Sequence, residues 1–296
     1  MRDSSAEVSV DASGWILTLS CTDRVGIVAR VTGWLAAIDG FILDSQQFAD
    51  LETGRFFMRV GFKAAGPAFP ASRDALVADF APVAAAFNLD WGLSAAADPP
   101  AMVVAVSTAS HCLNDLLYRQ KSGVLGARIA AVVSNHDSLR DLAEWHGVPF
   151  HYLPVSDANR TEQEVAIRAV MADAQAPYLV LARYMQVLTE PMTAALAGRC
   201  INIHHSFLPG FKGAKPYHRA HERGVKLIGA TAHFVTADLD EGPIIEQAVE
   251  RVDHRASVED MIRIGRDVEA QVLARAIGWV GQRRVFLDGN RTVVFR

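Results

Sequence analysis

The sequence contains few cysteines and no long apolar run. Its three cysteines, Cys21, Cys112 and Cys200, lie far apart and form no CxxC pair, so a zinc clip or redox motif of that type is excluded. They are typical of buried thiols in a reducing compartment. No stretch approaches the roughly 18 apolar residues of a membrane span, and the opening residues lack the apolar segment of a secretory signal peptide. We therefore expect a cytoplasmic protein that is not bound to a membrane.

An excess of positive charge is also absent. The 29 lysines and arginines are outnumbered by 33 aspartates and glutamates, which gives a formal net charge of −4. The overall charge therefore favours neither nucleic acid nor an anionic membrane as a partner. Half of the 296 residues are apolar and 21% are charged, which suits a globular protein. Two domains are expected at this length.

The N-terminal part alternates between the patterns of strands and helices. Strands show alternating apolar residues, and helices show an apolar stripe at a spacing of three to four residues. The expected elements are a strand at 15–22, a helix at 27–38, strands at 41–50 and 55–62, a helix at 72–87 and a strand near 88–93. This βαββαβ order predicts a ferredoxin-like α/β domain over residues 8–93, with an antiparallel sheet and two helices on one face.

The composition changes at residues 94–100, SAAADPP, which we interpret as a linker because its two prolines stop any strand or helix. Continuous apolar runs then appear at 101–106, 127–134 and 176–182, with helical segments between them. Strands buried on both faces and alternating with helices predict a Rossmann-like, mostly parallel sheet with helices on both faces. We assign this second domain to residues 101–296.

Two polar side chains interrupt the next apolar strand. Ile201 and Ile203 point to one face, so Asn202 and His204 project together from the other. A Pro-Gly pair follows at 209–210, which places Asn202 and His204 at the carboxyl end of the strand, where open parallel sheets bind ligands. Taken alone, the two side chains could equally cap the strand by bonding to loop carbonyls.

Two residues further along the chain add to this pair. His233 lies in another apolar strand-like run, and Asp240 lies in a turn that ends in Gly242-Pro243. An acid in such a turn often serves only the turn. An amide, two imidazoles and a carboxylate at strand ends nevertheless favour a catalytic site.

Histidines are concentrated in the same region. Five of them fall within thirty residues: His204, His205, His218, His221 and His233. No HExxH motif or equivalent carboxylate spacing accompanies them. We therefore expect no metal.

Several longer strings resemble one known family. They are NIHHSFLP, GAKPYHRAHERGVKLIGATAHFVTADLDEGPII, SHCLNDLLYR, SNHDSLRDLAEWHGVPFHYLPV and ETGRFFMRV. Together they resemble the formyltetrahydrofolate deformylases, members of the folate-dependent formyltransferase superfamily. The resemblance covers nearly the whole chain after about residue 12, and the N-terminal part resembles an ACT domain. It implies hydrolysis of 10-formyltetrahydrofolate to formate and tetrahydrofolate without a cofactor. In the cell this reaction would regulate the one-carbon folate pool and supply formate for purine synthesis.

The resemblance also implies roles for individual residues. The family's catalytic trio falls on Asn202, His204 and Asp240. The Asn202 amide is suited to hold the alkoxide that forms when water attacks the formyl carbon. His204 would supply a charge-assisted donor and a proton, and Asp240 would orient the imidazole and accept a hydrogen from the water.

Folate binding is implied for the run from Arg183 to Leu188. Its backbone would bond to the pterin ring and its apolar side chains would cover the ring; the alternative is that these side chains are ordinary core residues. The residues assigned to substrate binding are Met185, Gln186, Val187, Leu188 and His233. Lys212, Lys215 and Arg219 could meet the glutamate tail of the folate.

Formyl transfer to glycinamide ribonucleotide is the main alternative, because the transferase shares the trio. The transferase places a glycine-rich loop after its first Rossmann strand to bind the phosphate of the acceptor. The corresponding segment here, residues 106–112, has no glycine, which favours water as the acceptor. A methionyl-tRNA formyltransferase is less favoured, because it would need a basic surface and a further C-terminal domain for RNA, whereas this chain is net acidic. A second alternative is an amino-acid sensor without catalysis.

The N-terminal domain has its own candidate ligand site. Asp23, Arg24 and Gly26 lie at a strand-to-helix turn whose free N–H groups suit a carboxylate. The family resemblance implies methionine or glycine as the effector, bound across the interface of a homo-oligomer, a dimer or a tetramer. Phe41 stands where many ACT domains carry an asparagine, so a purely structural role in oligomerisation is the alternative.

Overall fold

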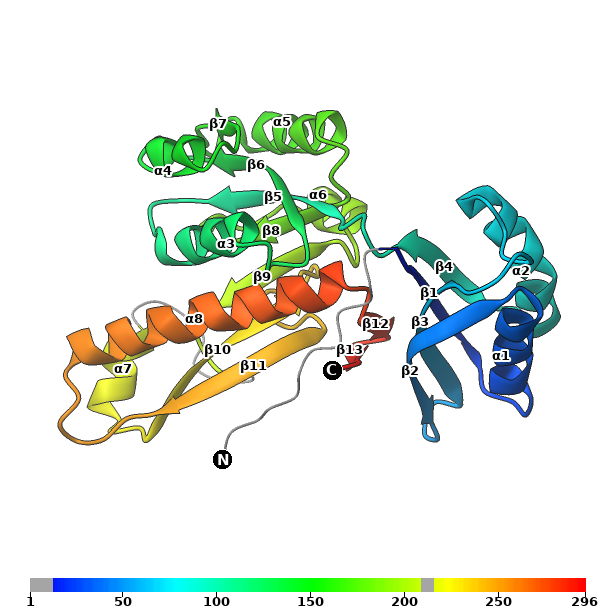
Figure 1. Ribbon diagram of the computed structural model, residues 1–296. Helices are drawn as coiled ribbons and strands as arrows, with labels where there is room; N and C mark the ends of the chain where they lie inside the picture. The colour runs from blue at the N-terminus through cyan, green and yellow to red at the C-terminus, as the bar shows by residue number, and fades with distance from the viewer. Residues whose placement is uncertain (1–12, 209–215) are drawn as a thin grey trace. The chain divides into compact units, whose positions relative to one another are not determined.

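The computed structural model describes residues 13–208 and 216–296, which form two compact units (Figure 1). Of the described residues, one unit comprises 13–99 together with Phe295 and Arg296, and the other comprises 100–208 and 216–294.

The first unit is the expected ferredoxin-like βαββαβ fold. Its elements are β1 (Trp15–Thr22), α1 (Ile27–Ala37), β2 (Gly40–Asp50), β3 (Arg55–Ala64), α2 (Arg73–Phe87) and β4 (Asp90–Ala95). The strand order is β2-β3-β1-β4, and every neighbouring pair is antiparallel. Strand β4 continues into the segment expected to be a linker, because Ser94 pairs with Ile16 and Ala95 pairs with Trp15.

Aromatic rings pack against one another in the core of this unit. The ring of Trp34 in α1 lies 4.7 Å from that of Phe80 in α2, and its indole nitrogen donates to the Asp79 carboxylate at 2.6 Å. Both helices lie on one face of the sheet, as Figure 1 shows. Helix α2 begins where predicted because the Ser72 side chain caps it by accepting from the Ala75 N–H.

The second unit contains a seven-stranded sheet. Its strands are β5 (Ala101–Val106), β6 (Arg128–Ser134), β7 (Phe150–Tyr152), β8 (Tyr178–Leu181), β9 (Cys200–His204), β10 (Leu227–Phe234) and β11 (Ile244–Arg251). The strand order is β11-β10-β9-β8-β5-β6-β7. The strands from β9 to β7 are parallel, whereas β10 and β11 are antiparallel to their neighbours. The predicted Rossmann-like, mostly parallel sheet is confirmed.

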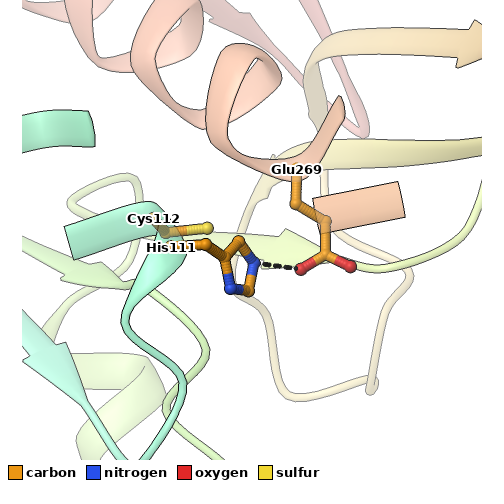
Figure 2. Close-up of side chains that lie close together, drawn as sticks. All are labelled: His111, Cys112 and Glu269. Carbon is orange, nitrogen blue, oxygen red and sulfur yellow. Dashed lines mark hydrogen bonds and ion pairs between the residues drawn. The ribbon is translucent and has the colours of Figure 1, made fainter. Parts of the chain in front are cut away.

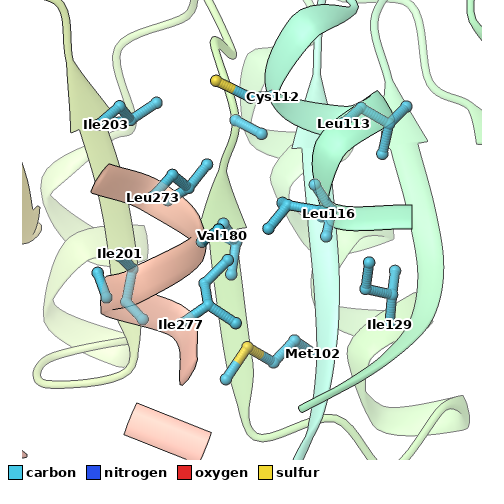
Figure 3. Packing of buried hydrophobic residues seen from close by; sticks show 14 of the residues in the cluster. Met102, Cys112, Leu113, Leu116, Ile129, Val180, Ile201, Ile203, Leu273 and Ile277 are labelled. Atoms are coloured by element: carbon cyan, nitrogen blue, oxygen red, sulfur yellow. The ribbon is translucent and has the colours of Figure 1, made fainter. Parts of the chain in front are cut away.

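Helices cover both faces of this sheet. They are α3 (His111–Lys121), α4 (Arg140–Trp145), α5 (Arg160–Asp173), α6 (Glu190–Ala195), α7 (Pro216–Glu222) and α8 (Val258–Gly281). Helices α3 and α8 pack on one face, where Leu113, Leu116, Leu273 and Ile277 meet strand residues such as Val180 (Figure 3). Helices α5 and α6 pack on the other face. A short hairpin of β12 (Val285–Asp288) and β13 (Arg291–Val294) ends the unit.

The cysteines lie in these cores. Cys21, Cys112 and Cys200 are buried and free, and burial is the main cause that raises the pKa of each thiol. In the described part of the chain, none of the helices combines the length and the apolar character that crossing a membrane requires.

Candidate active site

The polar residues predicted at the strand end share one face of the sheet. Asn202 in β9 stands opposite His233 in β10, and His204 stands opposite Thr231. The intervening Ile203 points to the other face and packs under α3 and α8. Alternation along two antiparallel strands therefore brings one amide and two imidazoles to the same place. Such residues could not lie on the apolar face without leaving buried polar groups unpaired.

Asp240 approaches this group from the turn after β10. Its backbone is left-handed, with φ 58°, a conformation that short polar residues tolerate. Its Oδ1 lies 3.1 Å from Nδ1 of His204 and 3.7 Å from Nε2 of His233. The hydrogen bond from His204 is the main cause that lowers the pKa of the Asp240 carboxyl well below its usual range, so the group is a carboxylate at neutral pH.

His204 is held at one nitrogen only. The residue is 6% exposed, and Asp240 Oδ1 lies 3.1 Å from its Nδ1. Among the described residues Nε2 has no hydrogen-bond partner although it is buried. A buried imidazole nitrogen without a partner is costly unless a ligand completes it.

His233 orients the Asn202 amide. Its Nδ1 lies 2.9 Å from the carbonyl oxygen of Phe234, which can only accept, so Nδ1 carries the hydrogen. In the neutral ring Nε2 then accepts from Nδ2 of Asn202 at 3.3 Å. One N–H of the amide is thereby occupied, and the other is available to a ligand.

A cleft of about 660 Å³ contains all of these side chains. Its wall also contains the residues expected to bind folate: Met185, Gln186, Val187, Leu188 and His233. Met185 and Val187 are 61% and 62% exposed, which contradicts the alternative of ordinary core residues for these two, whereas Leu188 packs against the core. Arg219 lies in α7, and Lys212 and Lys215 fall outside the described residues.

The loop that carries Met185 is fixed by side chains from neighbouring strand ends. The buried Ser107 hydroxyl accepts from the Met185 N–H at 3.0 Å and donates to the Asn135 side chain at 2.7 Å. Arg160 donates to the Val187 carbonyl at 3.0 Å. These bonds shape the segment after β8 before any ligand binds.

A buried ionic network beside the trio was not predicted from the sequence. Glu269 of α8 is 1% exposed and accepts from Tyr217 at 2.9 Å, and it lies 2.7 Å from Nε2 of His111. Arg183 completes the network, with Nε 3.4 Å from the carboxylate. Burial opposes ionisation of Glu269, but the His111 hydrogen bond and the Arg183 charge lower its pKa overall. The sequence feature that could have indicated this network was a glutamate on the buried face of an apolar helix.

His205 connects this network to the trio. Its Nδ1 lies 2.7 Å from Nη1 of Arg183, and its ring stacks on His204 with centroids 4.8 Å apart and planes at 25°. Arg183 adopts a left-handed φ of 64°, which costs a residue with a side chain about 1 kcal/mol or more. The fold therefore retains a strained arginine at this position.

His111, Cys112 and Glu269 could together offer ligand atoms to a metal, since one from each lies within 4.8 Å of the others (Figure 2). The geometry favours a hydrogen-bonded cluster instead. His111 and Glu269 are already at hydrogen-bond distance, and the guanidinium of Arg183 adds a positive charge beside the carboxylate. Burial raises the pKa of the Cys112 thiol, which opposes the thiolate form that a metal needs.

Comparison with known proteins agrees with this geometry. The formyl transferase family profile matches residues 101–277. The formyltetrahydrofolate deformylase of Corynebacterium sp. (strain P-1) is 47% identical over 95% of this chain and 98% of the relative. The crystal structure of the formyltetrahydrofolate deformylase from Burkholderia mallei is 49% identical, with a TM-score of 0.91 over 96% of this chain and 100% of that one. The chain belongs to the formyltetrahydrofolate deformylase family.

Transferases resemble a smaller part of this chain. The glycinamide ribonucleotide transformylase 1 of Symbiobacterium toebii is 31% identical, with a TM-score of 0.62 over 67% of this chain and 95% of that one. The part of the chain matched by the deformylases is therefore longer than the part matched by the transformylase.

The candidate effector residues lie on the first unit. Asp23 and Arg24 are exposed, and Gly26 takes a left-handed φ of 99° at the start of α1. Arg24 donates to the Ala86 carbonyl, and its guanidinium lies 4.2 Å from the centre of the Phe87 ring. Arg24 thus already holds the end of α2.

Proposed function

We propose that the protein hydrolyses 10-formyltetrahydrofolate to formate and tetrahydrofolate, with Asn202, His204 and Asp240 as its catalytic residues. The observation that carries the proposal is the His204 ring within a cleft large enough for a folate: Asp240 holds it at Nδ1, and its buried Nε2 has no partner among residues 13–208 and 216–296. The extended similarity to deformylases supports the same conclusion.

The reaction follows from these contacts. Water attacks the formyl carbon and the carbonyl electrons move to oxygen, where the free N–H of Asn202 donates to the alkoxide. Asp240 takes the proton of the water; because both imidazoles contact Oδ1, we assign this step to Oδ2. The alkoxide then re-forms the carbonyl and the C–N10 bond breaks. N10 receives the proton from Nε2 of His204 and leaves as the amine. Exchange with solvent restores both groups after formic acid departs.

Folate would lie along the segment after β8. The exposed Met185 and Val187 offer apolar surface to the pterin, and Gln186 offers an amide. Because Ser107 already uses the Met185 N–H, recognition of the ring falls to the remaining backbone groups of the segment. In the cell the reaction would adjust the one-carbon folate pool and supply formate for purine synthesis.

Formate release from 10-formyltetrahydrofolate, measured without any acceptor, tests the proposal. We expect formate and tetrahydrofolate in equal amounts, and a loss of roughly 10² to 10³ in kcat for Asn202→Ala. Formylated product seen only when glycinamide ribonucleotide is added would instead identify a transferase. If neither product forms, the remaining interpretation is a sensor without catalysis.

The first unit would bind a regulatory amino acid, methionine or glycine, near Gly26 in a homo-oligomer. The left-handed glycine at the start of α1 exposes backbone N–H groups to a carboxylate. Titration calorimetry of the whole chain with each amino acid tests this, and light scattering gives the oligomer. If neither amino acid produces a heat of binding, only the structural role in oligomerisation remains. We further propose a cytoplasmic location and no cofactor.

A further inference from the structure

The two adjacent imidazoles of the site compete for one charge. His204 and His205 are stacked with ring centroids 4.8 Å apart. Two cations at that distance in a buried cleft repel strongly, so protonation of one ring opposes protonation of the other. The proposed chemistry requires the charge on His204.

The groups around each ring differ. Asp240 contacts His204 at Nδ1. Arg183 contacts His205 at Nδ1, and because a guanidinium only donates, this nitrogen must carry a lone pair. The neutral His205 therefore bears its hydrogen on Nε2. Other charged or titratable groups near His205 in the described part of the chain include Asp240, Glu269, which pairs with Arg183, and Tyr217, whose ring centre lies 6.5 Å away.

We propose that Arg183 is a positioning residue that keeps His205 uncharged and so reserves protonation for His204. Glu269 lies 3.4 Å from Nε of the guanidinium and is itself held by His111 and Tyr217. The proposal rests on the proposed function, because it gives His204 the role of the acid.

The surroundings of His205 disfavour its charged form. Burial, the Arg183 charge and the neighbouring His204 lower its pKa to about 4, against the smaller opposing effects of Glu269 and Asp240. Tyr217 stays neutral, because burial and the Glu269 charge raise its pKa. His205 is therefore the ring that remains neutral across the ordinary pH range.

NMR of the full-length protein with ¹⁵N-labelled histidine tests the proposal without an activity assay. We expect the Nε2–H tautomer for His205 at pH 7 and no protonation until the pH falls to about 4. In Arg183→Gln we expect the midpoint to rise by about one pH unit. A charged His205 or an Nδ1–H tautomer at pH 7 in the unmodified protein would overturn the proposal, as would an unchanged midpoint in the variant.

Kinetics provide the second measurement. Arg183→Gln should lower the ratio of kcat at pH 4.5 to kcat at pH 8 by about threefold, because a His205 midpoint near 5 leaves this ring mostly protonated at pH 4.5. Adding His205→Gln should restore the ratio, since the competing ring is gone. Arg168→Gln, at an exposed site on α5, is the matched control.

The outcomes separate the two proposals. A neutral Nε2–H His205 in a protein that releases no formate would refute the proposed function and leave the charge assignment standing. Normal formate release with an unshifted pH ratio in Arg183→Gln would refute the assignment alone. If Arg183→Gln does not fold, the proposal is tested by the tautomer of His205 in the unmodified protein and by the same measurements on a folded Arg183→Lys variant.

Discussion

His204 and Asp240 meet through Nδ1 and Oδ1 at 3.1 Å, although one ends a buried strand and the other lies in a turn after the next strand. The contact fixes the imidazole by one nitrogen and directs the other toward the reacting group. The chemistry proposed for this cleft depends on that pairing.

Replacing Asp240 with asparagine should reduce kcat for formate release by roughly 10³-fold or more, because the amide cannot stabilise a charged imidazole and favours the wrong tautomer. Formate release under single-turnover conditions measures the effect. Asp253→Asn is the control, since Asp253 pairs with Arg255 on the surface. A loss below threefold in Asp240→Asn would remove this residue from the mechanism.

The same carboxylate should make stability depend on acid pH. The pKa of Asp240 is lower in the folded protein than its ordinary value of 3.8. Its contribution to stability is therefore complete above pH 3.8 and is lost as the pH falls through the folded-state value. Urea unfolding between pH 7 and pH 3 should show a gap between the unmodified protein and Asp240→Asn that narrows with acidification. A gap that is constant or widens would contradict the assignment.

Gly265 should be intolerant of a side chain. A Cβ built there lies 2.0 Å from the Tyr217 hydroxyl, so alanine must displace the tyrosine from Glu269. We expect a loss of about 1–3 kcal/mol in the free energy of unfolding and lower kcat. Gly33→Ala is the matched control, because it sits in helix α1 with nothing within 4 Å, and it should be neutral or stabilising. Adding Tyr217→Ala to Gly265→Ala should recover part of the lost stability. If nothing is recovered, the strain does not come from the contact with Tyr217.

Removing metal ions should leave activity unchanged. Dialysis against EDTA should not alter formate release, since the proposed steps use only side chains. Metal analysis of the dialysed protein provides the control. Loss of activity that returns on adding Zn²⁺ would instead assign a metal to His111, Cys112 and Glu269.

The sequence predicted the fold well because periodicity determines it. Strands β5, β6 and β8 are continuous apolar runs, and the first unit alternates clearly between the two periods. Asn202 and His204 stood out because they interrupt an apolar strand.

The buried ionic network was missed for a physical reason. His111, Arg183 and Glu269 come from three distant segments, and only the packing of α3 and α8 on one face brings them together. Taken alone, each of these residue types is ordinary at a protein surface. The C-terminal hairpin of β12 and β13 was also missed, because four-residue strands carry little periodicity.

Ser107 joins the ends of β5, β6 and β8 through one hydroxyl. The loop that would receive the pterin is therefore in its working shape in the empty enzyme. Little conformational entropy is then lost when the substrate arrives, and more of the contact energy is available as affinity. Changes to this serine should weaken substrate capture, while the rate of bond cleavage at the formyl group stays close to that of the unmodified protein.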